Sequence, residues 1–363
     1  MDFLRDHEQE ALADAVRSLL KGYDAERRRT VTETDPGFDE EIWQGLAEMG
    51  VLGLPFPEDV GGSGGGPVDV AVVAEEIGAV IAPEPFVEAV VLTGSLIAAC
   101  GSPEQQTELL GSLASGEMVP AFAWLTTRGH ELHVNDGRVT GVAEPVLNGG
   151  RADVFVVLAD DTLHLVDAAN TERTSYRTLD GGRAARVAFD AAPARPLGAG
   201  GDATEAVEQV LAATRIASCH ESLGAMETAL RLTTGYLTTR KQFGVTLNHF
   251  QALTFRAADM YTSLELTRSI VTWATMVLAD PRSTPAQVRD AAARAKLQVS
   301  RAGRHIGQEA IQLHGGIGMT MEYAVGHLVA RLTTLDHLLG DGDAQVAALA
   351  PRLGDYEVLE PLP

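Results

Sequence analysis

The chain has 363 residues, which is long enough for two or three domains with a large core. Hydrophobic residues make up 45% and charged residues 21%, as in ordinary soluble globular proteins. The net charge of -22 gives a surface that repels nucleic acid and anionic membranes, so we expect neither as a partner. The two cysteines, Cys100 and Cys219, form no CxxC motif, and we expect reduced thiols, no metal site and a cytoplasmic location.

Residues 1 to about 118 have helical periodicity. Apolar residues recur at helical spacing between Leu4 and Leu20, and a loop rich in Pro and Gly follows at 53–67. The segments VAVVAEEIGAVIA and PEQQTELLGSLASGE predict a buried helix and a further helix. The basic run 27–29 predicts a solvated helix face. The N-terminus MDFLRDHEQE is charged and lacks the apolar segment of a signal peptide, and no apolar run reaches the roughly 20 residues of a membrane span.

From about Met118 to Gly198 the period changes to two. LHVNDGRVTG predicts a hairpin with an Asn-Asp-Gly turn, and ADVFVVLADDTLHLVD predicts two strands around Asp160 and Asp161. ARVAFD predicts one more strand. This part of the chain is therefore expected to form a small β domain.

After Gly201 the helical period returns in four long amphipathic stretches, which predict a helical bundle. Their apolar stripes include Leu223 to Leu237, Leu253 to Leu264, Val288 to Leu313 and Val325 to Leu339. The fold class is therefore expected to be α+β and multidomain. We predict an N-terminal helical domain over 1–118, a middle β domain over 119–203 and a C-terminal four-helix bundle over 204–363.

Several segments, in order along the chain, resemble those of acyl-CoA dehydrogenases. They are IWQGLAEMGVLGLPFPEDVGG, SPEQQTELLGSLASGEMVPAFAWLT, LNGGRADVFVVLAD, TRKQFGVTLNHFQ and IQLHGGIGMTMEY. The last two resemble the Arg-x-x-Phe-Gly and Gln-x-x-Gly-Gly-x-Gly segments of that family. The resemblance implies the helix, β, bundle architecture and FAD-dependent α,β-dehydrogenation of an acyl-CoA thioester. Electron-transfer flavoprotein would be the electron acceptor.

The same segments imply where FAD is held. A pyrophosphate needs cationic or N–H donors, which a forked guanidinium supplies, and glycines permit close backbone approach. The residues implied for the dinucleotide are Arg240, Gln242, Phe243, Leu247, Gln312, Gly315 and Gly316. In the resembled family the two segments meet one FAD from adjacent subunits, so an oligomer is implied.

The flavin-ring end departs from the family pattern. Thr126 and Thr127 are retained as implied ring contacts, but the acidic-Pro-Gly continuation is absent. Where the family has Trp-x-Thr or Trp-x-Ser before Asn-Gly, this chain reads Pro-Val-Leu-Asn-Gly at 145–149. Leu147 cannot hydrogen-bond to a flavin. The sequence therefore predicts that the chain holds the flavin weakly or holds only part of it.

The catalytic base of the family is usually a Glu followed by Gly-Thr. Ungapped alignment places this base on Leu339, and the family's second base location falls on Thr214, before Arg215. With a two-residue insertion, Asp341-Gly342-Asp343-Ala344-Gln345-Val346 overlays Glu-Gly-Thr-x-Gln-Ile, which makes Asp341 the candidate base. The alternative is that Gly340 and Asp341 form a turn that caps the final helix.

Three functions follow from these observations. The first is an FAD-dependent acyl-CoA dehydrogenase with a displaced base. The second is a non-catalytic or half-site subunit of an α2β2 acyl-CoA dehydrogenase, as in actinobacterial steroid degradation, whose partner supplies the base. The third is a relative with other flavin chemistry, such as nitroalkane oxidase, which uses an Asp base. The expected partners are an acyl-CoA, electron-transfer flavoprotein, and either identical chains or a related subunit.

Overall fold

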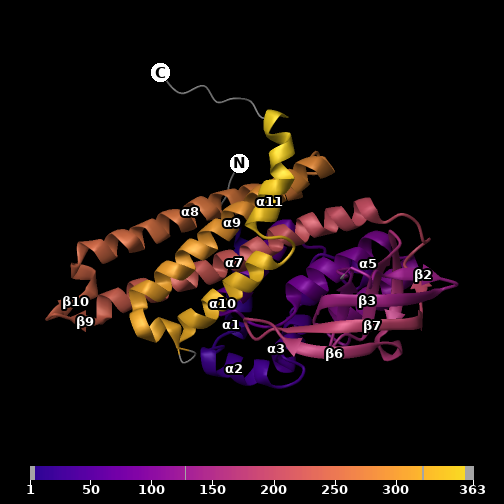
Figure 1. Cartoon of the computed structure of the whole chain (residues 1–363), viewed down its shortest axis with the longest axis horizontal. Coiled ribbons are helices and arrows are strands. Elements are labelled where there is room, and N and C mark those ends of the chain that lie inside the picture. Colours follow the sequence, from indigo (N-terminus) through magenta and orange to yellow (C-terminus); the bar gives the residue numbers. More distant parts are fainter. Residues whose placement is uncertain (1–4, 127, 321–322, 356–363) are drawn as a thin grey trace.

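A computed structural model describes residues 5–126, 128–320 and 323–355 of the chain. It confirms the predicted architecture: helices at the N-terminal side, two β-sheets in the middle and a bundle of long helices at the C-terminal side (Figure 1). The long helices α7, α8 and α9 run side by side, and the β-sheets pack at one end of them.

The N-terminal part is a cluster of short helices around one apolar core. Capping boxes at Asp6 and Ser102 start the first and last of these helices, each pairing a side-chain oxygen with a backbone N–H three residues later. The helices are α1 (His7–Leu19), α2 (Ala25–Glu33), α3 (Glu40–Glu48), α4 (Pro67–Val80), the π-helical segment η3 (Phe86–Gly94), α5 (Ser95–Cys100) and α6 (Pro103–Ala114), with 3-10 turns η1 (Val51–Gly53) and η2 (Glu58–Val60).

The middle part contains two four-stranded sheets. One has the order β1 (Pro120–Ala123), β4 (Val154–Ala159), β5 (Thr162–Asp167), β8 (Arg195–Pro196); the other has the order β2 (His133–Asn135), β3 (Arg138–Leu147), β7 (Arg183–Pro193), β6 (Glu172–Arg177). The short 3-10 turn η4 (Ala168–Asn170) follows β5.

Both predicted hairpin turns of the β-sheets are confirmed. Asp136 and Gly137 have φ angles of 48° and 70° between β2 and β3, and Asp160 and Asp161 have 48° and 61° between β4 and β5. Positive φ at two successive residues matches the right-handed twist of the flanking strands. Between the sheets, Phe155 meets Phe189 edge to face with ring centroids 5.9 Å apart.

The C-terminal part is the bundle. Its helices are α7 (Thr204–Thr239), α8 (Gln251–Ala279), α9 (Pro285–His314), α10 (Ala324–His337) and α11 (Gly342–Leu349), with 3-10 turns η5 (Leu247–His249), η6 (Gly315–Met319) and η7 (Ala350–Asp355). The predicted apolar stripes form one buried cluster, with Leu223, Met260, Ala295 and Leu328 among its members. Leu339, predicted as the last member of the α10 stripe, is buried but follows the helix.

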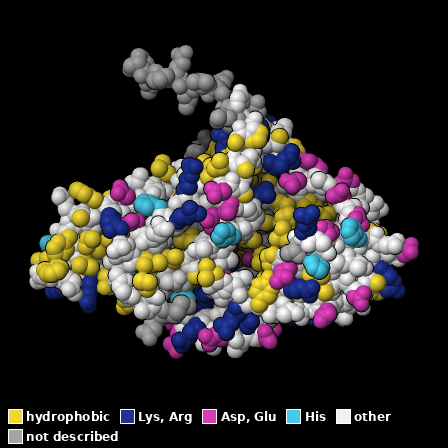
Figure 2. All heavy atoms as spheres, viewed as in Figure 1, with side chains coloured by type: hydrophobic (Ala, Val, Ile, Leu, Met, Phe, Trp, Pro, Cys, Tyr) yellow, Lys and Arg dark blue, Asp and Glu magenta, His cyan; other side chains and the backbone are white. Residues whose placement is uncertain are grey.

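A small hairpin, β9 (Lys241–Gln242) with β10 (Val245–Thr246), projects from the bundle at the end far from the β-sheets (Figure 1). Hydrophobic side chains gather on the surface at this end (Figure 2). Phe243 is 91% exposed and Met319 is 77% exposed, which is unusual for large apolar side chains. This end of the molecule therefore offers an apolar surface.

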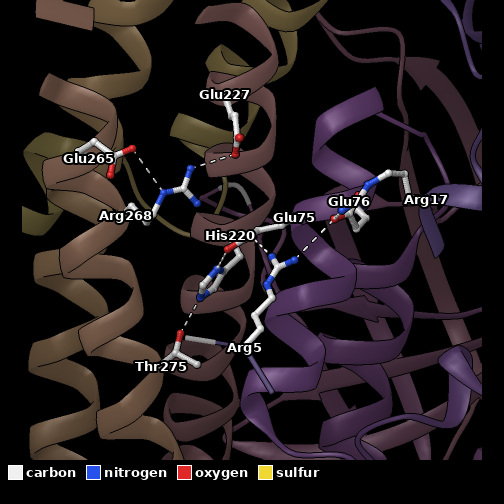
Figure 3. Close-up of polar contacts among 9 residues, drawn as sticks. All are labelled: Arg5, Arg17, Glu75, Glu76, His220, Glu227, Glu265, Arg268 and Thr275. Atoms are coloured by element: carbon white, nitrogen blue, oxygen red, sulfur yellow. Dashed lines mark hydrogen bonds and ion pairs between the residues drawn. The ribbon is translucent and has the colours of Figure 1, made fainter. Parts of the chain in front are cut away.

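A polar network fastens the first helix to the bundle (Figure 3). Arg5 pairs with Glu75 of α4, and Arg17 pairs with the adjacent Glu76 at 2.6 Å. The imidazole of His220 on α7 lies 2.6 Å from a Glu75 oxygen and 2.6 Å from Thr275 Oγ1 on α8. Burial alone would raise the pKa of Glu75, but its hydrogen bond with His220 and the charge of Arg5 keep that pKa below its usual range.

A second charged cluster joins all three parts of the chain at Arg331 of α10. Its guanidinium lies 2.9 Å from Asp180 of the β domain, 2.6 Å from Glu221 of α7 and 3.6 Å from Glu88 of η3. Burial alone would lower the pKa of Arg331, but these carboxylates raise it. Burial raises the pKa of Glu221 to about 7, in opposition to the charge of Arg331.

The basic run near the N-terminus corrects one prediction. Arg28 was expected on a solvated helix face, yet it is only 3% exposed. Its Nε donates to the Ile81 carbonyl at 2.8 Å and its Nη2 donates to the Asp180 carbonyl at 2.6 Å. Because a buried guanidinium needs acceptors, these carbonyls explain why one arginine of the three turns inward. Arg28 thereby extends the Arg331 cluster into α2.

Replacing Arg331 tests this cluster. Arg331→Leu leaves Glu88, Asp180 and Glu221 together without their shared cation, so we expect the free energy of unfolding to fall by about 3–5 kcal/mol. Denaturant unfolding of the purified variant measures the change. Arg282→Leu, which removes an exposed arginine paired with Asp280, is the control and should leave the midpoint unchanged. If Arg331→Leu is as stable as the wild type, the charged cluster around Arg331 does not stabilise the fold.

Glu84, in the turn between α4 and η3, predicts a pH dependence of stability. It is 3% exposed, its Oε1 accepts the Asp39 N–H at 3.1 Å, and burial raises its pKa to about 7. A carboxyl whose pKa is raised by folding binds its proton more tightly in the folded state, so its contribution to stability falls as pH rises from about 4.5 to about 7. Glu84→Gln mimics the protonated form. At pH 8 we expect its free energy of unfolding to exceed that of the wild type by about 1–3 kcal/mol.

The two proteins should differ little near pH 5. Denaturant titrations at the two pH values provide the comparison. If the free energies of unfolding of the two proteins differ by the same amount at pH 5 and at pH 8, Glu84 does not titrate in this range.

Candidate active site

A cavity of about 480 Å³ lies where the three parts of the chain meet. It is lined by the end of α4 and η3, the ends of β1 and β3, the segment around Asp180, and the last turn of α10 with the residues that follow it. Its volume lies in the range of cavities that enclose small organic ligands.

One side of the cavity is apolar. Phe122 and Trp124, at the end of β1, stack with centroids 5.7 Å apart and an interplanar angle of 8°. Leu92, Leu125 and Leu147 continue this wall. Leu147, which replaces a hydroxyl-bearing residue of the resembled pattern, therefore lines the cavity with carbon. Trp124 was not predicted as a site residue, although an aromatic directly after a buried strand is a usable signal.

The predicted ring-contact threonines lie at the edge of this wall. Thr126 is exposed, forms an isolated bridge with Ala143 of β3 and follows the cavity-lining Leu125 by one residue. Thr127 lies outside the described residues.

The other side of the cavity is charged. It is lined by Arg28, Arg183, Arg215, Arg331, Glu88 and Asp180. Sequence analysis missed these residues as a group because they come from five separate segments. Arg331 carried a signal: it falls three residues after the buried Leu328, on an otherwise apolar stripe. In a chain of net charge -22, four arginines around one cavity mark a local excess of positive charge.

The turn after α10 contains Leu339, the residue onto which ungapped alignment places the base of the resembled family. Leu339 and Gly340 line the cavity with φ angles of 60° and 94°. Arg215 Nε donates to the Leu339 carbonyl at 3.0 Å, and the buried Lys296 donates to the Leu335 carbonyl. Cations at carbonyls that the helix leaves unpaired stabilise a helix C-terminus. The turn is therefore held in place from two sides.

Asp341, the candidate base, is the N-cap of α11. Its Oδ1 accepts the Ala344 N–H at 2.9 Å, and Asp341 is not among the residues that line the cavity. Thr214, at the second base position, is buried and donates to the Val210 carbonyl at 2.8 Å. Within the described part of the chain, the carboxylates that line the cavity are those of Glu88 and Asp180.

The residues implied for the dinucleotide lie together at the far end of the bundle. Arg240, at the end of α7, is exposed and has no ion pair with any described residue. Gln242 and Phe243 belong to the β9–β10 hairpin, and Leu247 follows it. Gln312 is exposed near the end of α9.

The double glycine lies near the end of α7. The ring of Tyr236 on α7 lies 4.6 Å from that of His314, the residue before Gly315. Gly315 has φ 64° and ψ -144°, and no atom lies within 4 Å of a Cβ built on Gly315 or Gly316. The backbone is thus open to close approach, and with a free guanidinium nearby these residues fit the pyrophosphate and adenosine of FAD.

These two regions lie at opposite ends of α10. Tyr323, the N-cap of α10, touches His314 with ring centroids 5.0 Å apart, whereas the last turn of α10 lines the cavity. A helix of 14 residues spans about 20 Å at roughly 1.5 Å per residue. The dinucleotide segments of one chain are therefore separated from its own cavity by that length.

No group of three or more His, Cys, Asp or Glu among the described residues could hold a metal ion. No helix in the described part of the chain is long and apolar enough to cross a membrane.

The chain was compared with known proteins. The family described as "Acyl-CoA dehydrogenase, N-terminal domain" matches residues 6–117, and "Acyl-CoA dehydrogenase, C-terminal domain" matches residues 203–354. Acyl-CoA dehydrogenase IpdE2 of Mycobacterium tuberculosis is 30% identical over 321 residues, which cover 87% of this chain and 88% of that protein.

Two solved structures share the fold along nearly the whole chain. A chain of the ChsE4-ChsE5 complex from Mycobacterium tuberculosis has a TM-score of 0.90 and 25% identity, covering 99% of this chain and 100% of that one. A chain of the "Tcur3481-Tcur3483 steroid ACAD" has a TM-score of 0.86 and 28% identity, with 96% and 98% coverage. With both terminal domains matched and this extent of similarity, the chain belongs to the acyl-CoA dehydrogenase family of FAD-dependent oxidoreductases.

Proposed function

We propose that this chain is one subunit of a hetero-oligomeric, FAD-dependent acyl-CoA dehydrogenase. In this assembly it binds the adenosine and pyrophosphate of FAD, and a related subunit supplies the catalytic base. The observation that supports the proposal is the turn after α10, where Leu339, at the aligned base position, lines the cavity with carbon and Asp341 caps α11.

The residues of this turn matter because α,β-dehydrogenation requires a base. FAD, held by residues such as Arg240, would supply the acceptor for the hydride of the β carbon, while removal of the α proton needs a carboxylate within hydrogen-bond reach. Leu339 cannot accept a proton. For Asp341 to act on a ligand in the cavity, it would have to leave the Ala344 N–H, and loss of such a cap typically costs about 1 kcal/mol.

The separation of the two regions supports an oligomer. The 14 residues of α10, at roughly 1.5 Å per residue, place the proposed dinucleotide segments about 20 Å from the chain's own cavity. The chain is therefore suited to hold FAD for a neighbouring subunit. The exposed apolar residues at that end, Phe243, Val245, Ile317 and Met319, provide a surface for that neighbour. Two of the similar structures carry two names each, ChsE4-ChsE5 and Tcur3481-Tcur3483, which favours an unlike partner.

The substrate and the electron acceptor follow by analogy with these relatives. The Tcur3481-Tcur3483 protein is named a "steroid ACAD", so we propose a bulky acyl group, of the steroid or branched class, as the substrate of the assembly. Electron-transfer flavoprotein is proposed as the acceptor.

A second candidate is a self-sufficient dehydrogenase with Asp341 as its base. In its favour, Asp341 directly follows the cavity-lining Gly340, and its side chain is 38% exposed rather than sealed in the core. An aspartate base would also suit a family relative with other flavin chemistry. Both alternatives require Asp341 to be essential for turnover in an assembly of identical chains.

Expression of the chain alone and together with a related subunit separates these functions. We expect the isolated chain to lack a full complement of flavin and to have no dehydrogenase turnover, and the co-expressed assembly to have both. In the assembly, Asp341→Asn should keep more than half of wild-type turnover, as should the neighbouring control Asp343→Asn. A loss of about 10²–10⁴ in rate for Asp341→Asn alone would instead identify Asp341 as the base.

Arg240→Ala tests the cofactor contact. The free guanidinium of Arg240 is proposed to bind the FAD pyrophosphate, where each charge-assisted hydrogen bond is worth about 1.5–3 kcal/mol. We expect the assembly formed with this variant to lose FAD during gel filtration, as measured by the ratio of flavin to protein absorbance. Arg231→Ala, an exposed arginine on the same helix, is the control and should retain the cofactor. Equal flavin content in the two variants would refute the contact.

A further inference from the structure

We propose that His314 is a positioning residue for the adenosine and pyrophosphate half of FAD, because its ring fixes the double glycine relative to Arg240. The inference rests on the proposed function, in which these two segments bind the cofactor. Gly315 follows His314 directly at the end of α9, whereas Arg240 lies at the end of α7, much earlier in the chain. A dinucleotide that spans both segments needs a contact that sets their separation.

His314 is buried, and its ring has a fixed orientation. The residue is 3% exposed, and its Nδ1 lies 2.8 Å from the Ala310 carbonyl, one helical turn earlier. Nδ1 therefore carries the proton and donates it to that carbonyl. Burial lowers the pKa of His314 in opposition to this hydrogen bond, so the ring is neutral at pH 7. The buried Nε2 accepts no hydrogen bond from any described residue, and the ring meets its neighbours through its faces.

Two tyrosine rings from different helices pack against this imidazole. The ring of Tyr236 on α7 has its centroid 4.6 Å from that of His314, and the ring of Tyr323 at the start of α10 has its centroid at 5.0 Å. Burial and then the neighbouring Tyr236 raise the pKa of Tyr323, which indicates that the two tyrosines also lie close to each other. Aromatic pairs at such distances have preferred arrangements. The three rings thus form one cluster that joins α7, α9 and α10.

Tyr236 connects the ring cluster to Arg240. The Arg240 N–H donates to the Tyr236 carbonyl at 2.9 Å, and the Arg240 carbonyl accepts the Leu247 N–H at 2.9 Å. Between these two bonds the backbone of Arg240 is extended, with φ -73° and ψ 128°. The packing of Tyr236 on His314 therefore sets the place at which the chain leaves α7 and from which the guanidinium extends.

Two glycines keep the next turn against His314. Gly315 has a φ of 64°, which turns the chain directly after the imidazole residue. A Cβ on Gly318 would lie 3.0 Å from the His314 Cβ, so a side chain there would push the turn η6 away from the end of α9. Gly316, between them, has no atom within 4 Å of a built Cβ. The turn is therefore fixed at His314 and open at Gly316.

This arrangement is suited to a ligand that touches both segments. Binding groups must be held within roughly 0.5 Å of their productive positions by side chains that packing and hydrogen bonds lock in place. His314 is locked in both ways, by the two tyrosines and by its hydrogen bond to Ala310. Loss of its ring should therefore weaken the binding of the adenosine and pyrophosphate half of FAD.

Titrations of the flavin-free assembly test the proposal, with FAD and ADP as the probes. ADP carries the adenosine and the pyrophosphate without the flavin. By isothermal titration calorimetry, we expect His314→Leu to weaken the binding of both probes by the same factor, about 10- to 100-fold, because two aromatic contacts are lost. An equal factor for the two probes would locate the effect in the half of FAD that they share.

Further variants separate positioning from stability. His314→Phe keeps a ring but lacks the donor to Ala310, so it should bind both probes less tightly than the wild type and more tightly than His314→Leu. Tyr236→Phe keeps the packed ring and should bind like the wild type. Ile306→Ala, which removes a fully buried side chain two turns earlier in α9, is the control. It should lower the melting temperature and leave both affinities unchanged.

Three results would overturn the inference. They are wild-type affinities in His314→Leu, a loss of affinity for FAD without a loss for ADP, and an equal loss in Ile306→Ala, which would show an effect of stability alone. All three leave the proposed function intact, because Arg240→Ala tests the cofactor contact separately. A wild-type assembly that binds neither probe would contradict the proposed function and this inference together.

Discussion

The guanidinium of Arg331 contacts carboxylates from all three parts of the chain: the N-terminal helices, the β-sheets and the bundle. A buried cation is costly to desolvate, and each nearby carboxylate is costly too, so the arrangement is stable only when all of them are in place. Asp180, Glu221 and Glu88 belong to the β domain, the bundle and the N-terminal helices respectively. The cluster therefore adds a charged link among the three parts at the cavity, beside the apolar core that they share.

The cofactor segments and the cavity obey different constraints because α10 keeps them apart. The hairpin after Arg240 and the turn at Gly315 are surface features, and their proposed role for a dinucleotide depends on local backbone geometry. The cavity depends on packing between domains. An apolar residue in the cavity, such as Leu339, therefore need not disturb the surface segments at Arg240 and Gly315. This independence is a physical reason for a pair of related subunits to divide one activity between them.

The features that could be predicted from the sequence are those determined within a few residues. The Asp136-Gly137 and Asp160-Asp161 turns were predictable because few residues adopt positive φ, and the bundle helices because apolar residues recur with their period. The segments proposed to hold the dinucleotide are contiguous motifs, which is why the sequence alone suggests them. The inward position of Arg28 and the role of Arg331 were not predictable, because their acceptors, such as the Ile81 carbonyl, come from remote segments. For Asp341 the sequence allowed a base or a cap, and the structure shows its carboxylate capping α11.

Lys296 gives the turn after α10 one more property. It is 1% exposed, burial lowers its pKa, and its amine donates to the Leu335 carbonyl that ends the helix. The other lysines of the chain, Lys21 and Lys241, are exposed. An amine-reactive reagent would therefore reach two lysines in the closed protein and the third only when the end of α10 moves away. The rate at which Lys296 becomes labelled would therefore report local opening at the end of α10.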